Sequence, residues 1–246
     1  MKHQNFDNIS SSDKIKLYLT GYGPFGDIKE NPSQLLVDYL EDLNKKGEFP
    51  TFGDKIELIF THILDVNVES VQNHLKEIND IVSSEPDNSH LIIHFGVDAG
   101  IDCIDLENVA RNYICDYKGL NGKIIESDKE EDQLIFSKFD LESIRKILSD
   151  DKIKVSQNAG TYLCNYVYYL DSYELSRPNE NVHCLFIHVP ELHHLNTKNV
   201  SEKVFKILNQ LCLDIDCFRN QEYFNINEWE FIDINDYSDY IDFIQN

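Results

Sequence analysis

Short apolar segments alternate along the chain with longer amphipathic ones, and this alternation restricts the fold more than any other feature. The short segments are rich in β-branched and aliphatic residues, which favour strands, and several are apolar almost throughout. Continuous apolar runs are typical of strands that are covered on both faces. The predicted strands are residues 14–20, 55–63, 90–96, 152–157 and 183–190.

Between these segments, apolar residues recur at spacings of three and four, which is the pattern of a helix that buries one face. The pattern covers residues 35–43, 68–82, 141–148 and 200–211, and a further helix is expected to begin near Cys164. The alternation predicts an α/β fold, a three-layer sandwich in which helices cover both faces of a mostly parallel twisted sheet. In such folds, functional residues gather in loops at the carboxyl ends of the strands.

The chain has 246 residues and contains no linker rich in proline, glycine or serine. We therefore expect a flexible N-terminal segment at 1–13, one catalytic α/β domain at 14–212 and an acidic, aromatic C-terminal extension at 213–246. In the extension, Trp229 and Phe231 alternate with acidic residues, as in a strand or hairpin. A solvated acidic tail explains the same composition equally well.

Acidic residues outnumber basic ones by 44 to 22, giving a formal charge of −22. Such a charge repels phosphate backbones and anionic head groups, which argues against nucleic acid or membrane as partners. The first residues, "MKHQNFDNISSSDK", contain no apolar run of the kind found in signal peptides. We expect a cytoplasmic protein whose six cysteines are free thiols.

A glycine-rich segment, "TGYGPFGD", follows the first predicted strand and matches G-x-G-x-x-G at Gly21, Gly23 and Gly26. In a dinucleotide site, the third glycine lies in a helix that begins at once. Here the start signals come later, with Asn31 as a helix N-cap followed by Pro32. The segment is therefore a poor match to a nucleotide loop.

The same segment carries two aromatic residues, Tyr22 and Phe25, at the carboxyl end of a strand. Flat rings in that place suit a flat apolar or amide ligand. Rings that only cap the core are the alternative interpretation. The segment is thus a candidate binding loop.

One cysteine, Cys164, is expected in the first turn of a helix, after the turn "SQNAGTY". Asn158 or Thr161 is the predicted N-cap. The N–H groups of a first turn favour an anion, and a cysteine is a nucleophile only as its thiolate. Cys164 is therefore a candidate nucleophile, although a cysteine in a helix is more often a small buried apolar side chain.

A thiol nucleophile needs an imidazole that takes its proton and a carboxylate that orients the imidazole. His188 lies at the carboxyl end of the strand "HCLFIHVP", which Pro190 stops. Three acids after the third strand are candidates for the carboxylate: Asp102, Asp105 and Glu107. A rival zinc site would use Cys184, His188, His193 and His194. Residue spacing alone leaves both sites open.

Four motifs, in this order, resemble those of the pyroglutamyl peptidase I family: "TGYGPFG" followed by "NPS", "HFGVDAGIDCIDLENVARN", "NAGTYLCNY" and "FIHVP". The resemblance covers about residues 14–212. The segments "GVDAG", "YLC" and "YKGLNGK" are more similar to the animal than to the bacterial members. Where bacterial members carry a glutamine that contacts the substrate lactam, this chain has Val97.

The resemblance implies a cysteine peptidase that removes an N-terminal pyroglutamyl residue from peptides and needs no metal or organic cofactor. It implies Cys164 as nucleophile, His188 as base and then acid, and Glu107 as the orienting carboxylate. The implied substrate contacts are Tyr22, Phe25, Tyr162 and Leu163. A binding protein that has lost turnover, or a glutamine amidohydrolase with the same three residues, is the alternative function.

Overall fold

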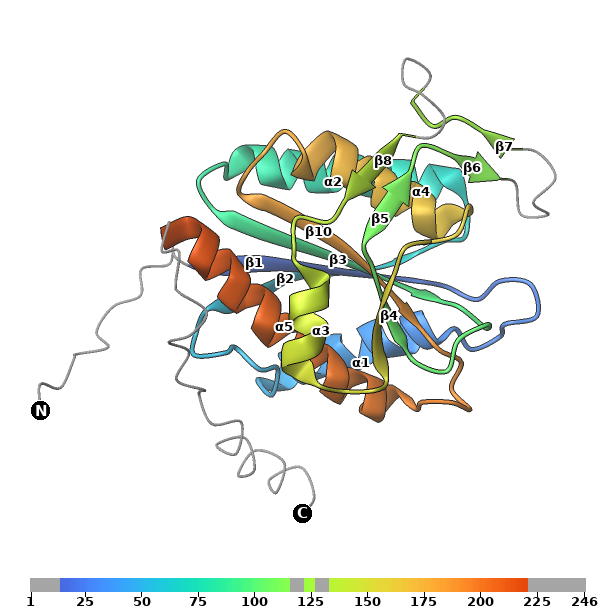
Figure 1. Cartoon of the computed structure of the whole chain (residues 1–246), viewed down its shortest axis with the longest axis horizontal. Coiled ribbons are helices and arrows are strands. Elements are labelled where there is room, and N and C mark those ends of the chain that lie inside the picture. Colours follow the sequence, from blue (N-terminus) through green and yellow to red (C-terminus); the bar gives the residue numbers. More distant parts are fainter. Residues whose placement is uncertain (1–13, 116–121, 127–132, 221–246) are drawn as a thin grey trace, which may run out of the picture. The chain divides into compact units, whose positions relative to one another are not determined.

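The computed structural model describes residues 14–115, 122–126 and 133–220, and it has the predicted α/β architecture (Figure 1). A six-stranded sheet has the order β2-β1-β3-β10-β4-β9. Its strands are β1 (Ile15–Tyr22), β2 (Ile56–Leu64), β3 (Ser89–Val97), β4 (Ile104–Glu107), β9 (Ile153–Ser156) and β10 (Val182–Val189). Neighbouring strands are parallel except at β10 and β4, which pair antiparallel. The predicted, mostly parallel sheet is confirmed.

All five predicted helices are present: α1 (Pro32–Lys46), α2 (Val68–Ser84), α3 (Leu141–Leu148), α4 (Leu163–Asp171) and α5 (Thr197–Asn220). A π-helical turn, Ser172–Ser176, continues directly from α4. Two small antiparallel pairs stand apart from the main sheet: β5 (Val109–Arg111) with β8 (Leu134–Phe136), and β6 (Ile114–Cys115) with β7 (Gly122–Lys123).

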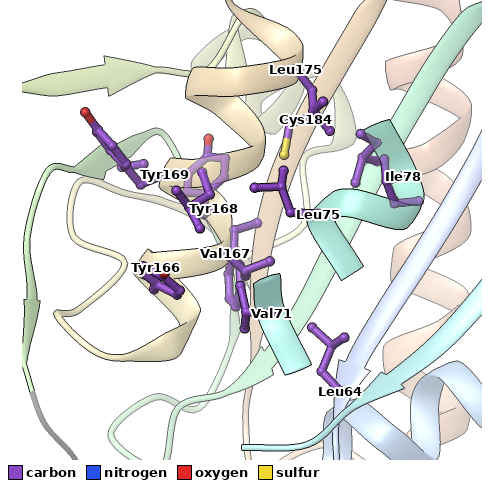
Figure 2. Packing of buried hydrophobic residues seen from close by; sticks show 14 of the residues in the cluster. Leu64, Val71, Leu75, Ile78, Tyr166, Val167, Tyr168, Tyr169, Leu175 and Cys184 are labelled. Carbon is purple, nitrogen blue, oxygen red and sulfur yellow. The ribbon is translucent and has the colours of Figure 1, made fainter. Parts of the chain in front are cut away.

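Helices cover both faces of the sheet, with α2 and α4 on one side and α1 and α3 on the other (Figure 1). Figure 2 shows the packing of the first pair, in which Val71 and Leu75 of α2 lie close to Val167 of α4. All three side chains are buried, so α4 is held between the sheet and α2. This packing fixes the helix that carries Cys164.

The start of α1 explains the glycine-rich segment without a nucleotide. Asn31 caps the helix, and its side chain accepts a hydrogen bond from Ser33 N at 3.0 Å, as predicted. A Cβ atom on Gly21 would lie 2.6 Å from the Ser33 carbonyl oxygen. Glycine at position 21 is therefore needed because the end of β1 packs directly against the start of α1.

The chain divides into two compact units, Met1–Cys212 and Leu213–Asn246. Helix α5 runs on to Asn220, so the first residues of the predicted extension are helical. The predicted N-terminal segment at 1–13 and the possible strand around Trp229 lie outside the described residues. None of the six cysteines forms a disulfide, as expected. Among the described helices, none combines the length and the apolar character that crossing a membrane requires.

Candidate active site

Cys164 is the second residue of α4 and is half-buried. In the turn that precedes α4, Gly160 has a φ of +78°, which favours glycine. The predicted cap is wrong: the N-cap is Tyr162, whose side chain makes no capping hydrogen bond. Asn158 instead accepts a hydrogen bond from Gly160 N at 3.3 Å and so stabilises the preceding turn. The first N–H groups of α4 have no intrahelical acceptor, and Cys164 is in the same turn.

His188 and Glu107 form a buried pair on two neighbouring strands. The distance between His188 Nδ1 and Glu107 Oε1 is 2.7 Å, and the two residues are 6% and 1% exposed. They come together because β10 and β4 run antiparallel, with Phe186 opposite Glu107. Tyr168 of α4 donates a hydrogen bond to the Glu107 carbonyl oxygen at 2.8 Å, which ties the end of β4 to the helix of Cys164.

Cys164 is the second group that interacts with the His188 imidazole. Burial lowers the pKa of His188, but the hydrogen bonds to Cys164 and Glu107 outweigh burial and raise it to about 10. His188 is therefore protonated at neutral pH and has a sulfur on one side and a carboxylate on the other. A protonated imidazole beside a cysteine stabilises the thiolate, the nucleophilic form.

The two other candidate carboxylates have different partners. Asp102 pairs with Lys152 at 2.9 Å, and both side chains are exposed. Asp105 accepts a weak hydrogen bond from Cys103 Sγ at 3.4 Å. Glu107 is the carboxylate that contacts the His188 ring.

The four predicted substrate contacts occupy different environments. Tyr22 is the last residue of β1 rather than a loop residue, and it is only 3% exposed. Its hydroxyl donates a hydrogen bond to the Leu163 carbonyl oxygen at 2.8 Å, so it supports the start of α4. Phe25 is half-buried and Tyr162 is 46% exposed, so both rings keep surface on which a ligand can pack.

Asn165 is a site residue that the sequence analysis missed. Its side chain accepts a hydrogen bond from Arg111 N at 2.8 Å and donates to the carbonyl oxygens of Arg111 and Tyr113 at 2.9 and 2.8 Å. The segment after β4 is thereby fixed to the residue that follows Cys164. One signal was available, because Asn165 is a polar residue within the apolar helix "LCNYVYYL".

The rival zinc site does not form. Cys184 is buried under α4, whereas His193 and His194 are exposed, and these residues do not converge with His188 on a common point. In the part of the chain that the structure describes, the residues that converge as metal ligands are His74, His94 and Asp171.

Gly96 of β3 leaves the space that the sulfur occupies. A Cβ atom there would lie 2.9 Å from Cys164 Sγ and 2.7 Å from the ring of Phe186. We expect Gly96→Ala to displace the sulfur, lower the turnover rate and destabilise the fold by about 1–3 kcal/mol. Gly100→Ala is the control, because its nearest neighbour is the side chain of Asp98 at 3.2 Å. Enzyme kinetics and thermal unfolding measure both effects, and equal rates for the two variants would contradict the packing described.

The family model for pyroglutamyl peptidase matches residues 15–214. The pyrrolidone-carboxylate peptidase of Pyrococcus furiosus is 31% identical over 188 residues, which are 72% of this chain and 81% of that protein. Human pyroglutamyl-peptidase 1 is 29% identical over 188 residues, 71% of this chain and 78% of the human protein.

A likeness in fold accompanies the likeness in sequence. The crystal structure of pyrrolidone carboxyl peptidase from Fervidobacterium islandicum AW-1 has a TM-score of 0.63 and 27% identity, covering 80% of this chain and 98% of that one. The structure from Thermus thermophilus has a TM-score of 0.62 and 22% identity, covering 78% and 98%. The matched family region includes the segments that supply Glu107, Cys164 and His188.

Proposed function

The chain belongs to the pyroglutamyl peptidase family, and we propose that it removes an N-terminal pyroglutamyl residue from peptides through Cys164, His188 and Glu107. The observation that carries the proposal is the buried His188 imidazole, which contacts the Glu107 carboxylate at 2.7 Å and interacts with Cys164 in the first turn of α4. Sulfur, imidazole and carboxylate in this order match the general requirement for an activated thiol nucleophile.

In the first half of the reaction, the Cys164 thiolate attacks the exocyclic carbonyl carbon of the pyroglutamyl group. The carbonyl electrons move to oxygen, and the N–H groups at the start of α4 stabilise the resulting oxyanion. When the tetrahedral intermediate collapses, the C–N bond breaks and His188 gives its proton to the departing amine. The products are the shortened peptide and a thioester on Cys164.

In the second half, the neutral His188 takes a proton from a water molecule, which attacks the thioester carbon. A second tetrahedral intermediate collapses, the C–S bond breaks and free pyroglutamate leaves. Glu107 accepts a hydrogen bond from His188 Nδ1, which turns the other ring nitrogen toward the sulfur and the water. Neither half requires a metal ion or an organic cofactor.

The ring pocket uses aromatic faces and not an ionic anchor, because a pyroglutamyl end carries no charged amine. Phe25 and Tyr162 supply the exposed faces, while the buried Tyr22 supports the start of α4 through its hydrogen bond to the Leu163 carbonyl oxygen. Specificity comes from the lactam N–H and C=O groups, since an analogue without them leaves buried polar groups unpaired.

A series of fluorogenic amides tests the substrate class. We expect turnover of the pyroglutamyl amide and a far lower kcat/KM for the prolyl amide, which has a ring of the same size but a charged amine in place of the lactam. Release of ammonia from glutamine would instead indicate the amidohydrolase. A folded protein that binds pyroglutamyl peptides and turns over none of these compounds would contradict the peptidase.

The pH dependence follows from the raised pKa of His188. Because the leaving amine needs a proton from His188, kcat/KM is expected to fall at alkaline pH with a midpoint near 10. The same group makes the free energy of unfolding depend on pH. Because the pKa of His188 in the folded protein lies above its unfolded value near 6.5, the stability that His188 contributes is complete below about pH 6.5 and is lost as the pH rises through 10. A pH–rate profile with its alkaline limb near 7 would contradict the contacts assigned to His188.

We place the chain nearer to the animal members, because "GVDAG" and "YLC" resemble their motifs. We place the reaction in the cytoplasm, where six cysteines without disulfides stay reduced. The expected partners are peptides with N-terminal pyroglutamate, and the high negative charge argues against nucleic acid and membranes.

A further inference from the structure

Three titratable side chains with no part in the proposed reaction meet in the interior. They are His74 of α2, His94 of β3 and Asp171, the last residue of α4. Each is 0% exposed. Burying three such groups together is costly unless they stabilise one another or a bound ion, so the cluster requires a physical explanation.

The geometry of the cluster is convergent. His74 Nε2 lies 3.3 Å and His94 Nε2 lies 3.0 Å from the same oxygen, Asp171 Oδ2. The three ligand atoms all lie within 4.8 Å of one another. Two imidazoles thus present the same ring atom to one carboxylate.

Hydrogen bonds alone leave this arrangement poorly satisfied. Although the nitrogen–oxygen distances are short, neither Nε2 atom nor either Asp171 oxygen has a partner in line with the hydrogen-bond direction among the described residues. Within the same part of the chain, the ion-pair partners of Asp171 are the two imidazoles, with no lysine or arginine. A buried carboxylate without a permanent cation is an unfavourable group.

A metal ion between the three groups would give the unpartnered nitrogen and oxygen atoms a ligand bond and would give the buried carboxylate a permanent cation. Bonds of 2.0–2.1 Å in a tetrahedral zinc site separate the ligand atoms by about 3.3 Å. The observed separations of 3.0 and 3.3 Å from Asp171 Oδ2 match that spacing. Asp171 Oδ1, which also lacks a hydrogen-bond partner among the described residues, is available as a further oxygen ligand.

The surroundings of His94 fit a metal ligand. Its other ring nitrogen, Nδ1, lies 2.8 Å from the hydroxyl oxygen of Thr20, which is itself 0% exposed. If Nδ1–H donates to Thr20, the lone pair of Nε2 points to the common centre. Such an outer hydrogen bond typically accompanies a histidine that binds a metal.

We propose that His74, His94 and Asp171 bind a first-row divalent transition metal ion, with Zn²⁺ the best match to two imidazoles and one carboxylate. Imidazole ligands suit such ions and not Mg²⁺ or Ca²⁺, which take oxygen ligands. The role is structural, because the site is sealed from solvent and lies at the end of α4 away from Cys164. The ion joins α2, β3 and α4, three elements whose packing positions that helix.

Burial of all three ligands sets how the ion enters and leaves. The ion binds during folding, and a chelator reaches it only when the protein unfolds. We therefore expect about one Zn²⁺ per chain to survive dialysis of the native protein against EDTA. Unfolding in guanidinium chloride with EDTA should release it. Refolding with and without Zn²⁺ should give a zinc-bound and a zinc-free form of the protein, and the zinc-bound form should have the higher midpoint of thermal unfolding.

Variants of the proposed ligands test whether the ion binds at this cluster. Asp171→Asn and His74→Gln are expected to lose the ion, whereas His90→Gln is expected to keep it. His90 is the matched control because it is also 0% exposed, and its ring contacts the Tyr18 hydroxyl at 2.9 Å instead of the cluster. Metal content measured in the Cys164→Ser background removes the thiol of the proposed active site as a competing ligand.

The outcomes are distinct. Zinc retained by the parent and by His90→Gln, and lost from the two cluster variants, supports the site. Refolding the parent with Co²⁺ adds a test without a cluster variant, since a tetrahedral site gives an intense visible absorption. A parent that refolds in Zn²⁺ and retains none after dialysis overturns the proposal. Zinc retained equally by Asp171→Asn also overturns it and indicates an adventitious ion only, for example at the exposed pair His193 and His194.

Discussion

Cys164→Ser is expected to lower kcat/KM for a pyroglutamyl amide by at least about a thousandfold. A serine hydroxyl in this place is not ionised by His188, and the reaction loses the thiolate that forms the thioester. The substitution keeps the size of the side chain at a half-buried position, so the packing of α4 is preserved. Circular dichroism and thermal unfolding should show a folded protein with a midpoint close to that of the parent.

Cys115→Ser is the matched control for this loss. Cys115 is likewise half-buried and outside any disulfide. Its backbone N–H donates a hydrogen bond at 2.6 Å to the carbonyl oxygen of Thr161, which lies three residues before Cys164. Because the backbone bond survives the substitution, the control variant should keep most of its activity. Retention of most activity by Cys164→Ser would reject Cys164 as the nucleophile.

Glu107→Gln is expected to lower kcat by up to about 10⁴-fold, with little change in KM. An amide removes the negative charge that holds the His188 proton, and its NH₂ group favours the wrong ring tautomer. Since Glu107 is 1% exposed, solvent does not replace the lost charge. The alkaline limb of the pH–rate profile should move to lower pH, because the carboxylate that raises the pKa of His188 is gone.

Asp105→Asn is the control for Glu107. Asp105 is on the same strand, lies opposite His188 in the register of β4 and β10, and bonds to Cys103 instead of the imidazole. Its effect on kcat should be much smaller than that of Glu107→Gln. A larger loss of kcat in Asp105→Asn than in Glu107→Gln would indicate that Asp105, and not Glu107, orients the imidazole.

The main elements of the fold could be predicted because each is long enough to show either an apolar run, for a strand, or a helical spacing of apolar residues. Segments such as residues 90–96 and 183–190 are apolar almost throughout and became the central strands β3 and β10. Strand β4 has four residues and no repeating pattern, so nothing in the sequence marked it. The antiparallel pairing of β4 with β10 was equally hidden, although it is what brings Glu107 to His188.

The candidate site was predicted less evenly. Cys164, His188 and Glu107 come from three distant segments, and their joint role rested on resemblance to a family, since spacing does not report contacts across a sheet. The predicted N-cap was wrong because the Asn158 side chain accepts a hydrogen bond from the turn before α4 and not from the helix itself. Tyr22 was placed on a loop, whereas β1 continues through it and buries its ring.

The cluster of His74, His94 and Asp171 was also missed. His94 was part of a predicted strand, and Asp171 followed an apolar helix. Each residue agreed with its own local pattern. Only the folded chain brings α2, β3 and α4 together around one carboxylate oxygen.

The rate of alkylation at each of the six thiols, mapped by mass spectrometry, tests whether sulfur, imidazole and carboxylate act as one unit. At neutral pH and limiting iodoacetamide, Cys164 should react first, its modification should match the loss of turnover one for one, and Glu107→Gln should slow it. Full turnover with Cys164 fully alkylated, or inactivation that follows another cysteine, would contradict the account.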